Sequence, residues 1–137
     1  MILVDANVLM YAAGAKHPNK KPSVDLLERI AQGTVDAALD AEVLQEVLHR
    51  YRAIARWAEG TQVYDHARRI FAIVLPITSG VVDDARILLD LHQAISARDA
   101  LHAAVVVTHE LDALCSYDRG FDQIEAVRRL PPEELLR

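Results

Sequence analysis

Short apolar runs alternate along the chain with longer segments in which apolar residues recur every three or four positions. The short runs, rich in β-branched residues, predict strands, and the longer amphipathic segments predict helices. The predicted strands cover residues 1–4, 34–39, 73–77, 112–117 and 124–127. The predicted helices cover residues 7–13, 40–58, 62–71 and 79–95, and Gly60 is expected to close the second of them. One more helix is capped by Ser23 and stopped at Gly33, one begins near Arg98, and a short one follows Pro131 and Pro132.

Strands separated by helices of this length require right-handed crossovers, which favour a mainly parallel sheet covered on both faces. The chain is therefore predicted to be a single α/β domain, residues 1–137: a three-layer α/β/α sandwich around a mainly parallel sheet of about five strands. The helix from about Arg98 is apolar almost all round, as expected of a helix covered by neighbours. In such a sheet the functional site lies at the carboxyl ends of the strands, where Asp5 and Asp118 fall.

Length and composition agree with one compact soluble domain, because 137 residues contain 52% hydrophobic and 26% charged side chains. The longest nearly apolar stretch, Ile70–Ile77, is far shorter than the roughly 20 residues that span a bilayer, so no membrane segment is expected. Asp5 follows the first apolar residues at once, which excludes a secretory leader of the usual kind. The lone Cys115 cannot form an internal disulfide. A cytoplasmic protein is predicted.

The formal net charge is −5 and the sequence pI is about 5.6. A protein that only grips phosphates is expected to be basic, with a pI above about 9, so the overall charge argues against nucleic acid. The objection weakens if several carboxylates converge on divalent cations, because each bound ion reverses the local field that a phosphate meets. Whether the chain is suited to bind nucleic acid therefore depends on where the acids lie.

Each candidate acid also has an ordinary structural interpretation. Asp5 is placed to cap the first helix. Ser96 and Asp99 form a pattern close to a capping box, although Asp99 opens the most buried helix, where an unpaired carboxylate is costly. Glu46 lies off the apolar stripe of its helix and by default is a solvated acid. Asp118 and a second acid, Asp122, share a strand-to-turn segment that favours aspartate for conformational reasons.

Taken together, four stretches of the chain resemble the PIN-domain nucleases and, among them, the VapC-type toxins of prokaryotic toxin–antitoxin pairs. The stretches are residues 2–9 (ILVDANVL), 42–48 (EVLQEVL), 96–104 (SARDALHAA) and 114–122 (LCSYDRGFD). The resemblance implies that Asp5, Glu46, Asp99 and Asp118 form an acidic quartet. It also implies that Asp122 is an accessory acid and that Asn7 orients Asp5. Relatives commonly have Ser or Thr where this chain has Asp40, which caps a helix equally well. Glu42, a turn from Glu46, remains a rival for its role.

The resemblance implies a metal-dependent endoribonuclease that hydrolyses RNA with water activated by Mg²⁺ or Mn²⁺. Hard oxygen ligands suit these ions, and the sequence offers no soft ligand set. Asp5, Asp99 and Asp118 are expected to hold the metal, directly or through water, and Glu46 to act as a ligand or as the base that orients water. The expected products carry a 5′-phosphate and a 3′-hydroxyl. Arg50 and Arg119 are weaker candidates for RNA contacts.

The resemblance also implies partners: a homodimer, and a small cognate antitoxin whose tail wraps the toxin and blocks the acidic pocket. The apolar faces of residues 23–30 and 62–71 are candidates for these contacts, or for core packing. Rival functions are a metal-free ribonuclease using a pair such as His49 and His102, a phosphotransferase, and a non-catalytic PIN-like protein- or RNA-binding module. The phosphotransferase needs a second aspartate where this chain has Asn7.

Overall fold

The computed structural model describes all residues, 1–137, and shows five parallel strands flanked by helices. The elements in chain order are β1 (Ile2–Val4), α1 (Ala6–Ala13), α2 (Lys20–Ala31), β2 (Ala37–Asp40), α3 (Ala41–Ala53), α4 (Trp57–Ile70), β3 (Val74–Leu75), α5 (Ser79–Leu91), α6 (Ala97–Thr108), β4 (Ala113–Cys115), the 3₁₀ helix η1 (Arg119–Gln123), β5 (Arg129–Leu130) and α7 (Pro132–Leu135). The strand order is β3-β2-β1-β4-β5. The predicted three-layer α/β/α fold is confirmed.

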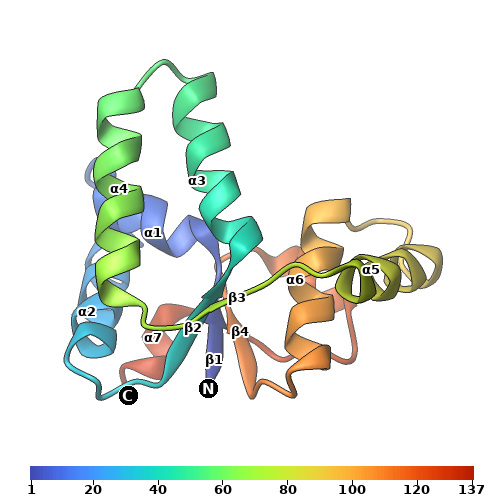
Figure 1. The fold of residues 1–137 in the computed structure, drawn as a ribbon. Coiled ribbons are helices and arrows are strands. Elements are labelled where there is room, and N and C mark those ends of the chain that lie inside the picture. Colours follow the sequence, from blue (N-terminus) through green and yellow to red (C-terminus); the bar gives the residue numbers. More distant parts are fainter.

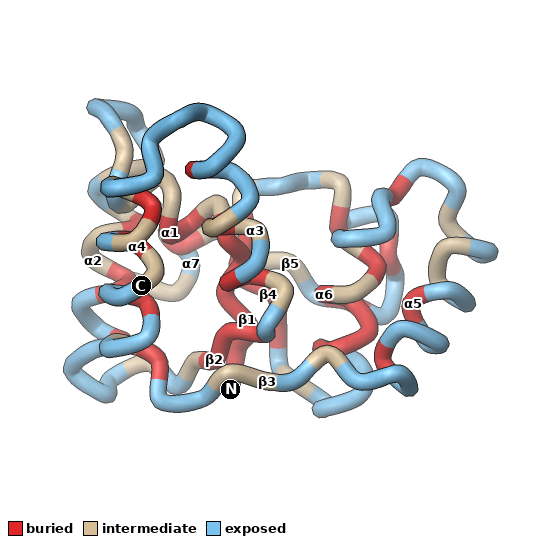
Figure 2. The backbone as a smooth tube through the Cα atoms, turned by 45° about the horizontal axis from the view of Figure 1, so that its top comes forward, coloured by how far each residue is buried: buried red, intermediate tan, exposed pale blue.

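Alternating strand residues build an apolar core on each face of the sheet. Ile2 and Val4 of β1 join the cluster beneath α1 to α4, whereas Leu3 joins the cluster beneath α5 and α6. Successive side chains of a strand point to opposite faces, so even a three-residue strand contributes to both layers. The two helical layers lie on either side of the strands in Figure 1, and the central strands are the most continuously buried part of the backbone in Figure 2.

The predicted helix over residues 40–58 is wrong at its end, because the chain turns at Ala55. Ala55 adopts a left-handed backbone conformation (φ 57°), and the Arg56 amide donates to the Tyr51 carbonyl, which closes the end of α3. Gly60 was expected to close this helix but lies inside α4. A Cβ atom at Gly60 would stand 2.4 Å from the Cβ of Tyr51, so the glycine allows α3 and α4 to pack closely as an antiparallel pair.

Two further boundaries differ from expectation. The strand predicted at residues 124–127 is β5, at Arg129–Leu130; Ile124 and Val127 are buried, so their apolar pattern reflects anchoring of a loop rather than strand pairing. The second helix begins at Lys20, before Ser23, whose hydroxyl donates to the Asn19 carbonyl instead of capping the helix. Pro22 fits this first turn because the amide it lacks has no partner there.

None of the helices combines the length and apolar character that crossing a membrane requires.

Candidate active site

An acidic cleft of about 450 Å³ opens at the carboxyl edge of the sheet. Because parallel strands end at the same edge, residues that follow different strands meet there. The cleft is lined by Asp5, Asn7, Met10, Glu46, His49, Arg50, Ala53, Ser96, Arg98, Asp99 and Asp118. All four acids of the predicted quartet therefore face one hollow, although 113 positions separate the first from the last.

Asp5 lies at the junction of β1 and α1, where both of its carboxylate oxygens are held. Oδ1 accepts from the Ala6 amide at 2.7 Å, which caps α1, and Oδ2 accepts from the Ser116 hydroxyl at 2.7 Å. The Asn7 side chain donates to Asp5 Oδ2 (3.3 Å) and to Ser116 Oγ (3.0 Å). Asp5 is only 6% exposed, so these bonds fix the direction of a nearly buried carboxylate.

Asp99 and Asp118 approach the cleft from α6 and from the end of β4. The Asp99 amide donates to the Ser96 hydroxyl (3.1 Å), so Ser96 caps α6, and the Asp99 carboxylate makes no return bond to the Ser96 amide. Burial raises the pKa of Asp99, and the charges of Asp118 and Asp5 raise it further. Asp118 is exposed and caps η1 through Gly120. These acids are close enough to repel one another.

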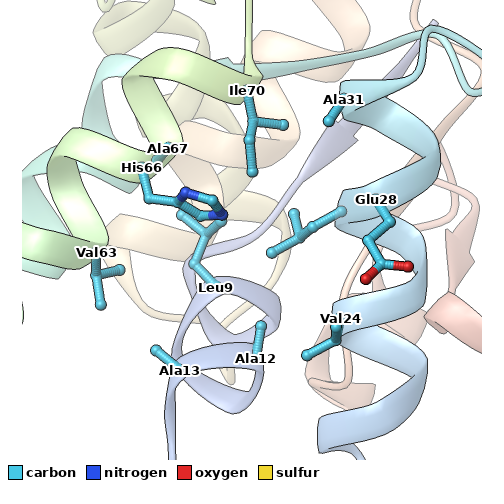
Figure 3. Close-up of a pocket in the computed structure, with 11 residues that line it drawn as sticks. Leu9, Ala12, Ala13, Val24, Glu28, Ala31, Val63, His66, Ala67 and Ile70 are labelled. Carbon is cyan, nitrogen blue, oxygen red and sulfur yellow. The ribbon is translucent and has the colours of Figure 1, made fainter.

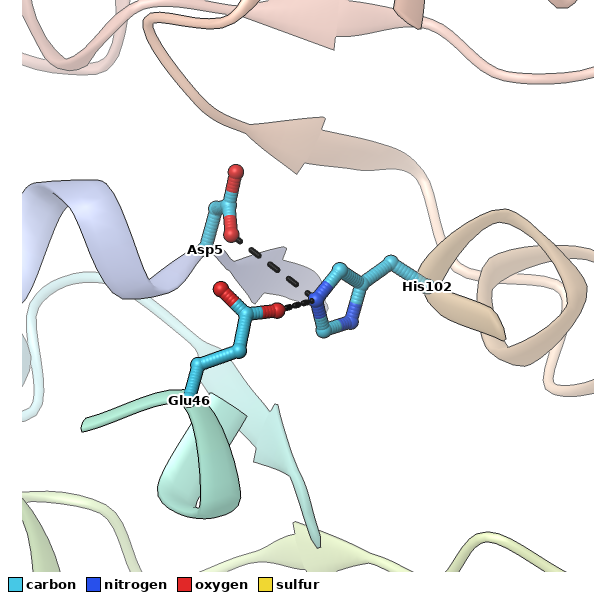
Figure 4. Close-up of side chains that lie close together, drawn as sticks. All are labelled: Asp5, Glu46 and His102. Atoms are coloured by element: carbon cyan, nitrogen blue, oxygen red, sulfur yellow. Dashed lines mark hydrogen bonds and ion pairs between the residues drawn. The ribbon is translucent and has the colours of Figure 1, made fainter. Parts of the chain in front are cut away.

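Glu46 on α3 meets His102 on α6, and His102 also contacts Asp40 at the end of β2. His102 Nε2 lies 2.6 Å from Glu46 Oε1, and Nδ1 lies 2.6 Å from Asp40 Oδ2. Asp40 and His102 are 0% and 1% exposed, and Nε2 also lies 3.9 Å from Asp5 Oδ1. Figure 4 shows the Asp5 and Glu46 carboxylates converging on the Nε2 edge of the imidazole ring. A buried imidazole thus connects the sheet to the wall of the cleft.

Burial and hydrogen bonding act against each other in this group. Burial raises the pKa of Glu46 above its ordinary value, and the hydrogen bond to His102 offsets only part of that rise. Burial lowers the pKa of His102, but the hydrogen bonds to Asp40 and Glu46 and the charges of Asp40 and Asp5 outweigh burial, and the pKa ends well above the ordinary value. The raised pKa favours the imidazolium form of His102 between the two carboxylates. Both of its nitrogens are occupied, so it has no free position for acid–base chemistry.

The donor set of the cleft fits a hard divalent cation. A carboxylate oxygen of Asp5 and one of Glu46 lie within 4.8 Å of each other and of His102 Nε2, and Asp99 and Asp118 line the same hollow. The carboxylates are the available donors, because both nitrogens of His102 are already hydrogen-bonded. Mg²⁺ and Mn²⁺ prefer carboxylate oxygens of this kind. The raised pKa values of Glu46 and Asp99 reflect desolvated negative charge that a cation would relieve.

The remaining candidates occupy different surroundings. Asp122 forms a two-pronged ion pair with Arg129 (2.8 and 3.2 Å), which lowers the pKa of Asp122, and it does not line the cleft. Arg119 is exposed on η1, outside the lining, whereas Arg50 and His49 line the cleft. Glu42 contacts only the guanidinium of Arg98, at 3.8 Å, while Glu46 faces both Arg98 and His102.

Sequence reasoning missed three participants. Asp40 was interpreted only as a helix cap, no structural partner of His102 was named, and Ser116 appeared only as part of a motif. A usable signal was present for His102, because an imidazole inside a helix that is apolar all round must find polar partners when it is buried. Nothing in the sequence indicates which residues those partners are.

Comparisons with known proteins identify the family. The PIN domain family model matches residues 2–127. Ribonuclease VapC13 of Mycobacterium tuberculosis is 45% identical over 130 residues, covering 95% of this chain and 99% of that protein. Among solved structures, M. tuberculosis VapC20, a Sarcin-Ricin loop cleaving toxin, superposes with a TM-score of 0.74 at 16% identity, covering 91% of this chain and 95% of that one. A toxin–antitoxin complex from Klebsiella pneumoniae gives a TM-score of 0.68 at 16% identity, covering 96% and 98%.

A five-stranded parallel sheet with acids gathered at its carboxyl edge, matched over most of its length by the family model, defines a PIN domain. Within that family, the identity to relatives that the chain covers almost completely places it with the VapC ribonucleases. The chain belongs to the PIN-domain VapC family.

Proposed function

We propose that this protein is the endoribonuclease toxin of a toxin–antitoxin pair and that it requires Mg²⁺ or Mn²⁺. Membership of the VapC family supports the ribonuclease and toxin activity. The observation that carries the metal requirement is the convergence of Asp5, Glu46, Asp99 and Asp118 on one cleft, with Glu46 and Asp99 at raised pKa. Without acids in this arrangement, a non-catalytic binding module would be the better interpretation. The proposed compartment is the cytoplasm, where RNA is available and the free thiol of Cys115 stays reduced.

Asp5, Asp99 and Asp118 would hold the metal, which supplies Lewis-acid stabilisation of the charge that develops on the phosphate. Ser116 and Asn7 fix Asp5 so that its carboxylate needs little reorganisation during the reaction. The His102 hydrogen bond holds Glu46 Oε1, which leaves Oε2 to accept a proton from the attacking water. Asp122 is proposed to act indirectly, by holding Arg129 against the Ser116 carbonyl, to which Arg129 Nη1 donates at 3.0 Å.

Hydrolysis by water predicts 5′-phosphate and 3′-hydroxyl ends. The decisive assay compares the wild type with Asp99→Asn, with and without chelator, and analyses the product ends. We expect cleavage that chelator abolishes and Mg²⁺ or Mn²⁺ restores, and at least a 100-fold loss in the variant, roughly the effect of removing one electrostatic group from a catalytic site. Asp25→Asn, which removes a partly exposed acid of α2 that pairs with Lys21 outside the cleft, is the matched control. Chelator-resistant cleavage that leaves 2′,3′-cyclic phosphates would instead favour a scheme built on His49.

The antitoxin is proposed to dock in an apolar groove between α1, α2 and α4. The groove encloses about 310 Å³, and 9 of its 11 lining residues are hydrophobic. Figure 3 shows Val24 and Ala31 of α2 facing Val63 and Ile70 of α4 across α1. The groove thus lies between the apolar faces of residues 23–30 and 62–71, which the sequence analysis names as candidate contact surfaces. Val24→Glu should weaken antitoxin binding without altering RNA cleavage; unchanged antitoxin affinity would remove the assignment.

A homodimer is proposed to form through α5. Ile87 and Leu91 are 55% and 71% exposed and lie one helical turn apart on the outer layer. Apolar side chains exposed in a row favour burial against another protein surface. Leu91→Glu should shift the protein from dimer to monomer in sedimentation velocity, whereas Leu91→Met should not. A monomeric wild type would contradict the proposal.

A further inference from the structure

The connection between α3 and α4 carries most of the unpaired positive charge near the cleft. We call residues 50–62 the hairpin tip; it contains Arg50, Arg52 and Arg56 and one acid, Glu59, in a chain whose net charge is −5. Arg56 pairs with Glu59 at 2.6 Å, but Arg50 and Arg52 have no carboxylate within ion-pair distance. The tip projects beyond the sheet and is exposed over most of its length (Figures 1 and 2). Its charge is therefore available to an anionic partner.

The only tryptophan of the chain lies on this tip. Trp57 is 38% exposed, and the guanidinium carbon of Arg52 lies 4.0 Å from the centre of its ring. Beside the ring is a shallow hollow of about 380 Å³, which Arg56, Glu59 and Gln62 also line. Arg52 is not among the residues that line the hollow, so an exposed indole that packs on a cation also borders open space, and such a ring can receive a nucleobase by stacking.

The tip is continuous with the acidic cleft. Glu46, Arg50 and Ala53 recur at spacings of four and three residues, so they lie on one face of α3, and all three line the cleft. Arg56 and Trp57, just beyond the end of α3, line the hollow. Ala53, which lines the cleft, and Ala55, which lines the hollow, are two residues apart, so at 3.8 Å per residue their Cα atoms lie within roughly 8 Å of each other. A single-stranded RNA bound in the cleft can therefore reach the hairpin tip within a few nucleotides of the reacting phosphate.

We propose that the hairpin tip binds the single-stranded RNA that flanks the cleaved bond. A base stacks on Trp57 in the hollow, Arg52 backs the indole, and Arg50 and Arg56 contact phosphates. This inference rests on the proposed ribonuclease function, and it resolves the conflict between an acidic protein and a polyanionic substrate: the positive contacts are concentrated beside the carboxylates. Single strands suit this surface because aromatic stacking combined with arginine is how unpaired bases are held.

Binding is measured without metal, in chelator, using a short fluorescein-labelled oligouridylate and fluorescence anisotropy. Trp57→Leu should weaken binding by roughly 5- to 100-fold, the effect of losing one stacked base, and Trp57→Phe should restore most of it. Arg50→Gln, which removes a proposed phosphate contact, should reduce the slope of log affinity against log salt by up to about 0.7. Arg29→Gln, an exposed arginine on α2, is the matched control and should behave like the wild type. Thermal melting of each variant establishes that it is folded.

Because Trp57 is the single tryptophan, its intrinsic fluorescence gives a second and direct readout. Titration with the oligouridylate should quench or shift its emission with the same midpoint as the anisotropy. The inference is overturned if RNA binds without changing the emission and Trp57→Leu binds like Arg29→Gln. It is also overturned if Trp57→Leu alters only self-association or antitoxin binding, which would make the tip a protein interface. A wild type that neither binds nor cleaves RNA would remove the proposed function as well, whereas normal metal-dependent cleavage by Trp57→Leu would remove this inference alone.

Discussion

Replacing Asp40 by Asn tests whether the buried contact between Asp40 and His102 is an ion pair. Asp40 Oδ1 accepts from the Val43 amide at 2.9 Å, and Oδ2 contacts His102 Nδ1 at 2.6 Å. Asparagine has the same shape and caps helices about as well as aspartate, so the cap of α3 is retained. With the cap kept, the substitution removes the negative charge that faces the imidazolium and replaces the accepting Oδ2 by an amide NH2 group, which cannot accept from His102 Nδ1.

The expected cost follows from burial, since both side chains are at most 1% exposed. Removing one partner of a buried ion pair costs about 3–5 kcal/mol. Glu46 still faces the other nitrogen of His102, so we expect the lower end, about 3 kcal/mol. An unfolding entropy of about 2.1 cal/mol/K per residue gives about 0.3 kcal/mol/K for 137 residues, and the melting temperature should fall by about 10 °C.

The effect should also depend on pH. The pKa of His102 is raised in the folded protein, so the stability gained from its proton is fully present below the unfolded pKa of about 6.5 and is lost as the pH rises through the folded pKa. Asp40→Asn lowers that folded pKa. The difference in unfolding free energy between wild type and variant should therefore be largest near pH 6 and shrink in alkaline buffer. Urea denaturation in chelator at several pH values measures it.

Asp65→Asn on the exposed face of α4 is the matched control and should change the unfolding free energy by less than about 0.5 kcal/mol. In the double variant with His102→Gln, the two destabilisations should not add, because the residues share one contact. A cost below about 1 kcal/mol at pH 6, or one that is equal at pH 6 and in alkaline buffer, would show that the pair is neutral and refute the reasoning.

Three further results are expected. Asp99→Asn should raise the melting temperature of the metal-free protein, because it removes a half-buried carboxylate whose pKa is raised by desolvation and by two neighbouring acids. The same variant should abolish the stabilisation by Mn²⁺, which for the wild type reaches about 2.7 kcal/mol at an ion concentration 100-fold above its dissociation constant. The pKa values of Asp99 and Glu46 are raised in the folded protein, so lowering the pH through those values should stabilise the metal-free protein relative to neutral pH. Urea denaturation measures this change, and an unfolding free energy that does not change with pH would contradict the raised pKa values. Gly60→Ala should destabilise by about 2 kcal/mol, since its Cβ would meet Tyr51, whereas Gly80→Ala, whose Cβ would meet nothing closer than 3.8 Å, should be nearly neutral in thermal melting.

The order of elements and the place of the site could be predicted because both follow from general geometry. Parallel strands joined by helices end at one edge, so acids after β1 and β4 had to meet. The end of α3 could not be predicted in the same way. Ala55 carries no signal for a left-handed conformation, which usually falls to glycine, and Gly60, which looked like the stop, serves the packing of α4 on Tyr51 instead.

The partners of His102 could not be predicted because the contacts are long-range. Asp40 and Glu46 lie 62 and 56 positions away from it, and the choice among acids depends on how α6 crosses the sheet. Periodicity placed Glu46 on the polar side of α3, which was correct in the sense that it is not core. Periodicity does not indicate that this polar side of α3 faces the start of α6 across the cleft rather than solvent.

The acids at the strand ends also show why capping and function need not be alternatives. A carboxylate has two oxygens, and at a strand-to-helix junction one of them can satisfy a free amide of the first helical turn while the other points along the sheet edge. Asp40 divides its oxygens in this way, between Val43 and His102, and Asp5 divides them between Ala6 and Ser116. The cap fixes the rotamer, so it orients the second oxygen for the site. A signature that reads as a helix cap is therefore the arrangement expected of a well-oriented acid at this edge, and it gives no ground for assigning such a residue a purely structural role.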